Sequence, residues 1–96
     1  MAVAIEMNFR GASTDQYDQV IQKMGLRQGG PTPPGAISHF VTRTDDGIKV
    51  VDVWETKEAF EKFAEEQIGP YTREVGISEE PEMRFHDVHN YLIKAQ

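Results

Sequence analysis

The feature that most constrains this chain is a repeated change in the spacing of its apolar residues. Residues 2–9 are apolar at every second position on one face, which predicts a strand; these positions are Val3, Ile5, Met7 and Phe9. Residues 17–24 are apolar at i, i+3, i+4 and i+7, which predicts an amphipathic helix. Two more strands, a second helix and a fourth strand are predicted to follow, so the order is β-α-β-β-α-β.

Local signals mark the ends of the first helix. Ser13 offers an N-cap hydroxyl, and Gln16 stands three residues later, which is the spacing of a capping box. Gly25 follows at a position typical of a helix end. Residues 29–35 (GGPTPPG) are predicted to form an irregular loop, because three prolines fix φ and remove backbone donors. We expect this loop to be a rim over a pocket.

The rest of the chain is predicted to form a hairpin, a helix and a strand. Residues 36–43 and 48–54 are strand-like, and the turn between them contains Asp46-Gly47, a strong hairpin signal. Thr56 caps the second helix, which we expect to end at Gly69-Pro70, with a short helical turn from Pro70 to Val75. Residues 82–93 alternate along their length and are predicted to form the last strand.

This order predicts one ferredoxin-like α+β domain over residues 1–96. Its four-stranded antiparallel sheet would have the order 4-1-3-2, with both helices on one face. The other face also carries apolar side chains, among them Phe40, Val51 and Val53. Because monomers avoid large exposed apolar patches, we expect a homodimer packed sheet to sheet. The alternative is a monomer whose second sheet face is partly exposed to solvent.

Charge and composition exclude several classes of function. The chain has 10 basic and 16 acidic residues, and this net charge of −6 argues against binding nucleic acid or an anionic membrane surface. It has no cysteine, which excludes disulfides and thiol nucleophiles. No signal peptide or membrane-spanning run is visible, so we expect a cytoplasmic protein. The glycine-rich nucleotide motifs and the serine-hydrolase motif are absent too.

His39 and Asp52 are the main candidates for chemistry. If residues 44–47 form the hairpin loop, His39 lies opposite Asp52; a two-residue loop at Asp46-Gly47 would put Trp54 opposite His39 and keep all three on one face. A three-residue loop would break this arrangement. Asp52 would orient the imidazole and hold its proton, so that His39 could act as general base on an acidic phenol or enol. The alternative is structural, with Asp52 satisfying a half-buried histidine.

Other side chains could line a pocket beside this pair. Trp54 could stack on a planar ligand through its ring. The further ligand-binding positions that we predict are Met24, Phe60, Phe63, Tyr71 at the mouth of the pocket, and Asn8 near the end of the first strand. The alternative is that these side chains, together with Tyr91, simply fill the core.

The remaining histidines do not predict a metal site within one chain. His86 and His89 are separated by three residues, which puts them on opposite faces of a strand. His39 would lie on the opposite edge of the sheet, about 14 Å away at three strand spacings. A site shared across a dimer is the alternative.

The second half of the chain resembles the dimeric α+β barrel superfamily, and within it the antibiotic-biosynthesis-monooxygenase-like proteins. The resemblance runs from Ile37 to the end, with the first strand and helix matching only by pattern. It is carried by His39-Phe40-Val41, Asp46-Gly47, Val50–Thr56 (VVDVWET), Phe60, Phe63, Pro70 and Glu80-Pro81. It implies a sheet-to-sheet dimer with a cavity between sheet and helices.

For function, the resemblance implies an enzyme that acts on a planar, ionisable, quinol-like substrate without a bound cofactor. His39 would be its base and Asp52 the orienting group. Haem-degrading relatives also use an Asn, which Asn8 could match, but no histidine lies between Glu55 and Phe85 to ligate iron, so haem degradation is not expected. Two alternatives remain: a non-catalytic dimeric ligand-binding or stress-related protein, and a structural dimer whose cavity is filled by side chains.

Overall fold

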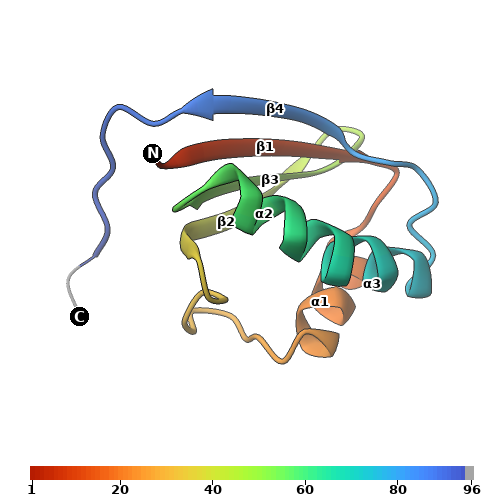
Figure 1. Ribbon diagram of the computed structural model, residues 1–96. Helices are drawn as coiled ribbons and strands as arrows, with labels where there is room; N and C mark the ends of the chain where they lie inside the picture. Colours follow the sequence, from red (N-terminus) through yellow and green to blue (C-terminus); the bar gives the residue numbers. More distant parts are fainter. Residues whose placement is uncertain (95–96) are drawn as a thin grey trace.

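The computed structural model describes residues 1–94. Four strands form one antiparallel sheet in the order β2-β3-β1-β4, and the helices cover one face of it (Figure 1). This is the predicted ferredoxin-like α+β plait. Its elements are β1 (Val3–Arg10), α1 (Thr14–Lys23), β2 (Ala36–Thr44), β3 (Gly47–Trp54), α2 (Lys57–Phe63), the π-helical segment η1 (Ala64–Ile68), α3 (Gly69–Glu74) and β4 (Glu82–Asp87).

Both main helices begin at the caps that the sequence predicts. The Ser13 hydroxyl accepts a hydrogen bond from the Gln16 backbone N–H (3.1 Å), and the Gln16 side chain accepts one from the Ser13 N–H (3.0 Å). Gly25, just after α1, has a φ of 78°. The Thr56 hydroxyl accepts from the Ala59 N–H (3.1 Å) and caps α2. These bonds satisfy N–H groups that a helix start leaves without partners.

The helical path does not end at Gly69-Pro70, so that part of the prediction is wrong, but the short helical turn expected from Pro70 to Val75 is present as α3. The path runs on from α2 through η1 into α3 (Figure 1). The Gly69 N–H donates to the Ala64 carbonyl five residues earlier, which is π-helical spacing. Pro70 then falls in the first turn of α3, where a missing N–H costs little.

The last strand is shorter than predicted. β4 ends at Asp87, and residues 88–94 leave the sheet (Figure 1). The Val88 N–H donates to the Ala2 carbonyl (3.0 Å), and β1, the strand that β4 pairs with, begins at Val3, so pairing stops there. Tyr91 is 45% exposed rather than part of the core. His89 lies outside the strand, so it does not share one strand with His86 as predicted.

The hairpin between β2 and β3 has the register that aligns the candidate residues. His39 pairs with Asp52, as predicted for a loop over residues 44–47, but Thr44 also pairs with Gly47, so the loop itself is only Asp45-Asp46. Gly47 is not in the left-handed region; glycine is needed because a Cβ there would lie 2.0 Å from the Phe9 carbonyl oxygen. The turn thus closes directly onto β1.

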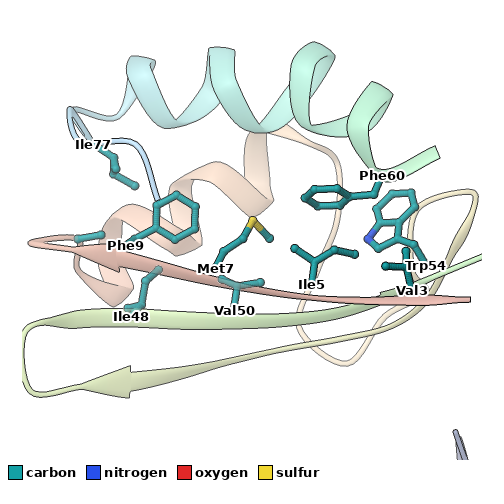
Figure 2. Close-up of a cluster of buried hydrophobic side chains, with 10 residues drawn as sticks. Val3, Ile5, Met7, Phe9, Ile48, Val50, Trp54, Phe60 and Ile77 are labelled. Carbon is teal, nitrogen blue, oxygen red and sulfur yellow. The ribbon is translucent and has the colours of Figure 1, made fainter. Parts of the chain in front are cut away.

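The core lies between the sheet and the helices that cover it (Figure 2). Along β1 and β3 every second residue is buried, as the period of two predicts. Within residues 1–94, no helix is long and apolar enough to cross a membrane. The buried hydrophobic residues of this cluster are Val3, Ile5, Met7, Phe9, Ala12, Ile48, Val50, Trp54, Phe60 and Ile77.

The opposite face of the sheet is part apolar and part charged. Phe40 is 55% exposed and pairs with Val51, which is half-buried. Beside them, Glu6 lies 2.8 Å from Lys49 Nζ and 3.3 Å from His86 Nε2. The hydrogen bond and the charge of Lys49 hold the pKa of Glu6 below its usual range. The structure contains one chain, so the sheet-to-sheet dimer stays a prediction.

Candidate functional site

A cavity of about 510 Å³ lies between the sheet and the helices. Strands β1, β2 and β3 supply its floor, and α1 with the path from α2 to α3 supplies its walls. Residues 26–33 contribute to the lining, so part of the predicted proline-rich loop does border a pocket. This volume is within the range of pockets that bind small organic molecules.

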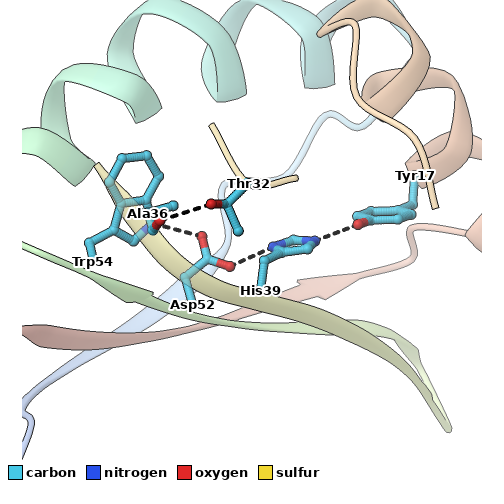
Figure 3. Close-up of polar contacts among 6 residues, drawn as sticks. All are labelled: Tyr17, Thr32, Ala36, His39, Asp52 and Trp54. Carbon is cyan, nitrogen blue, oxygen red and sulfur yellow. Dashed lines mark hydrogen bonds and ion pairs between the residues drawn. The ribbon is translucent and has the colours of Figure 1, made fainter. Parts of the chain in front are cut away.

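Four side chains that line the cavity form one continuous hydrogen-bonded chain (Figure 3). Trp54 Nε1–H donates to Asp52 Oδ2 at 3.0 Å. Asp52 Oδ1 lies 2.6 Å from His39 Nδ1, and His39 Nε2 lies 2.5 Å from the Tyr17 hydroxyl. We call this set, Tyr17, His39, Asp52 and Trp54, the relay.

Three different elements position the relay. Asp52 and Trp54 are two residues apart on β3, so they point to the same face of the sheet. The hairpin register places His39 on β2 directly opposite Asp52. Tyr17 comes from the first half of α1, and its ring is nearly parallel to the imidazole, with 7° between the planes and 5.9 Å between centroids. The relay therefore spans from the sheet to the helix layer.

Burial sets the electrostatics of the relay. Asp52 is 4% exposed and is the single buried polar or charged residue within the described part of the chain, whereas the His39 side chain is 29% exposed. Both Asp52 oxygens accept hydrogen bonds, which offsets the cost of burying the carboxylate. Burial, together with the negative charge of Asp52, raises the pKa of Tyr17 to about 12. The Tyr17 hydroxyl therefore keeps its proton at neutral pH.

The structure gathers five of the predicted site residues around the cavity and places three elsewhere. His39, Asp52, Trp54, Phe63 and Met24 all line it. Phe60, Tyr71 and Asn8 do not. Phe60 is 1% exposed in the core, with its ring edge-on to Trp54 at 5.8 Å, and Asn8 borders a small hollow at the hairpin end of the sheet.

Tyr17 is the residue that the sequence analysis did not single out as part of the site. It was placed only in the apolar stripe of the first helix. Its hydroxyl could have identified it as a site residue. The other apolar positions on the same face of the helix, Val20, Ile21 and Met24, have no polar atom for hydrogen bonding of this kind. Among residues 1–94, no three His, Asp or Glu side chains come close enough together to hold a metal ion.

Asp52 should be a major contributor to stability. We expect Asp52→Ala to lower the free energy of unfolding by about 2–4 kcal/mol, because Trp54 Nε1–H and His39 Nδ1 would both lose their partner inside the protein. The measurement is urea denaturation followed by Trp54 fluorescence. Glu61→Ala, which removes an exposed carboxylate on α2, is the control and should change stability by less than about 0.5 kcal/mol. Equal stability of Asp52→Ala and the unmodified protein would contradict this account.

No protein-family model matches the chain, and no curated protein matches it. Solved structures do match. A conserved protein from Methanosarcina mazei Go1 superposes with a TM-score of 0.61 at 8% identity, over 90% of this chain and 91% of that chain. SnoaB, a cofactor-independent oxygenase from Streptomyces nogalater, gives 0.59 at 16% identity over 97% of each chain.

A monooxygenase from the gene ActVA-Orf6 of Streptomyces coelicolor, solved with the ligand nanaomycin D, gives a TM-score of 0.52 at 21% identity. The match covers 98% of this chain and 92% of that chain. Further structures of the same kind come from Deinococcus radiodurans and Chloroflexus aurantiacus. The chain therefore has the fold of the antibiotic-biosynthesis-monooxygenase-like proteins, as the resemblance in its sequence predicted.

Proposed function

We propose that the protein is a cofactor-independent monooxygenase that oxygenates a planar, ionisable, quinol-like aromatic substrate in the cavity. The observation that carries the proposal is a histidine–carboxylate pair, His39 and Asp52, on the floor of a cavity of about 510 Å³ whose other lining residues are largely apolar. Two proteins with the same fold are named as an oxygenase and a monooxygenase, which supports the reaction class.

In this proposal His39 is the general base. Asp52 holds the Nδ1 proton, so Nε2 carries the lone pair that takes up a proton, which reaches it through its hydrogen-bond partner, the Tyr17 hydroxyl. Loss of a proton from a phenol or enol leaves an electron-rich anion, which can pass an electron directly to O₂. The mostly apolar lining of the cavity would hold this anion in one orientation toward O₂.

The reaction balances without a second reductant. Oxygen adds to an activated CH₂ carbon, so a C–O bond forms, and the O–O bond then breaks. The carbon becomes a carbonyl, and the second oxygen leaves as water with the two hydrogens of the former CH₂ group. The substrate thus loses the four electrons that O₂ gains.

The apolar lining suits a flat, aromatic substrate. The Trp54 ring lies 5.0 Å from the Phe63 ring, with 42° between their planes, and both border the cavity. Met24, from the end of α1, adds a flexible apolar side chain to the same lining. These surfaces offer stacking and dispersion contacts to a planar ring system.

Oxygen uptake tests the proposed reaction. With anthrone as substrate, we expect enzyme-dependent consumption of one O₂ per molecule, and His39→Ala should lower the rate about 10²–10⁴-fold because it removes the base. The measurement is an oxygen electrode with product analysis after reaction in ¹⁸O₂. His89→Ala, which removes an exposed imidazole outside the sheet, is the matched control and should keep the rate. A rate no higher than that of anthrone alone would contradict the proposal.

Binding without turnover is the second candidate function. The observation that favours it is that both ring nitrogens of His39 already have hydrogen-bond partners. Such a protein would show no oxygen uptake with anthrone but a higher melting temperature when apolar aromatic ligands are present. The oxygen electrode therefore separates the two candidates.

We also propose that the active unit is a homodimer packed through the exposed sheet face. Phe40, at 55% exposure, and its neighbour Val51 form the apolar part of that face. Light scattering should give twice the mass of one chain, and Phe40→Glu should shift the protein toward one chain because it buries a charge in the interface. Lys62→Glu on the outer surface of α2 is the control and should stay dimeric. A single-chain mass for the unmodified protein would contradict the proposal.

A further inference from the structure

The direction of every hydrogen bond in the relay is fixed from its buried end. The indole N–H of Trp54 can only donate, and an ionised carboxylate can only accept. Trp54 Nε1–H occupies Asp52 Oδ2, and Asp52 Oδ1 must therefore accept from a protonated His39 Nδ1. In a neutral imidazole this leaves Nε2 without a proton, as an acceptor.

Because His39 Nε2 is an acceptor, the Tyr17 hydroxyl must be the donor in the next hydrogen bond of the relay. Its single proton points to His39 Nε2, which lies 2.5 Å away. Two lone pairs on the hydroxyl oxygen remain, and Tyr17 lines the cavity. The end of the relay on α1 is therefore an oxygen that can accept a hydrogen bond but has no proton left to donate.

We infer that Tyr17 is the specificity-determining residue of the cavity, and that it selects ligands with an O–H donor, such as phenols, enols and hydroquinones, over ethers and quinones. This inference rests on the proposed function and names the substrate class for the same cavity. A substrate hydroxyl would donate to Tyr17 Oη while Tyr17 donates to His39 Nε2. The substrate does not need to touch the imidazole, whose two nitrogens are both occupied.

This arrangement also explains how a proton reaches the base. The substrate proton passes to Tyr17 Oη as the Tyr17 proton passes to His39 Nε2, so Tyr17 is neutral before and after the step. The raised pKa of Tyr17, about 12, agrees with a hydroxyl that passes a proton on without itself ionising. Where oxygenation turns an enol into a carbonyl, the product at that position has lost its donor and binds less tightly than the substrate.

Matched ligands test the inference without turnover. Calorimetric titration with 1-naphthol and 1-methoxynaphthalene compares the same ring system with and without the O–H donor. We expect the unmodified protein to bind 1-naphthol at least about tenfold more tightly, which corresponds to one net hydrogen bond. Tyr17→Phe should abolish this preference, because it removes the oxygen that accepts from the naphthol hydroxyl. Tyr91→Phe, outside the cavity and 45% exposed, should keep it.

Asp52→Asn provides a second, independent test of the inference. Trp54 Nε1–H would hold the amide oxygen, so the amide N–H₂ would face His39 Nδ1 and force that nitrogen to accept. The proton would then move to Nε2, which would donate to Tyr17, and the Tyr17 proton would turn toward the cavity. We expect this isosteric change to abolish the preference, because the oxygens of 1-naphthol and of its methyl ether can both accept from the Tyr17 hydroxyl. Circular dichroism of each variant confirms that it is folded.

The outcomes separate this inference from the proposed function. If the preference for 1-naphthol persists in Tyr17→Phe, or if the unmodified protein shows none, the inference is overturned even where anthrone oxygenation is observed. If the preference follows Tyr17 and Asp52 as predicted but no oxygen is consumed, the inference holds and the enzymatic proposal fails. A preference that survives in Asp52→Asn would also overturn the direction assigned to the relay.

Discussion

One buried carboxylate organises this molecule. Asp52 lies under the helices at 4% exposure, and a group that can only accept hydrogen bonds needs donors at that depth. Trp54, two residues along β3, and His39, across the hairpin, supply them. His39 Nε2 is then the acceptor for the Tyr17 hydroxyl on α1, so the donor and acceptor of each hydrogen bond follow from the one before it. The same contacts therefore join the sheet to the helix layer and give the cavity its polar end.

Much of the fold could be predicted because its signals are local. The alternation along β1 and β3, the capping box at Ser13 and the turn before Gly47 each depend on residues close in sequence. The errors arose where the outcome depends on distant partners. β4 stops opposite Val3, the first residue of its neighbour β1, and the helical path passes Pro70 because this residue falls in the first turn of α3, where a missing N–H costs little.

The candidate site could be predicted to a similar extent. Strand register alone put His39 against Asp52, since a sheet face repeats every two residues. Tyr17 could not be found in this way, because its contact depends on how α1 docks on the sheet. The same limit explains Phe60 and Phe63: both lie on the apolar side of α2, but only Phe63 borders the cavity. Which of the two does so is decided by helix rotation and not by spacing.

The most direct test of this account is the position of the proton on His39. In ¹⁵N-resolved NMR of the neutral imidazole, the account predicts a protonated Nδ1 and an unprotonated Nε2 that accepts from Tyr17. The proton should move to Nε2 in Asp52→Asn. A proton on Nε2 in the unmodified protein would mean that the relay runs in the opposite direction, and would contradict the account.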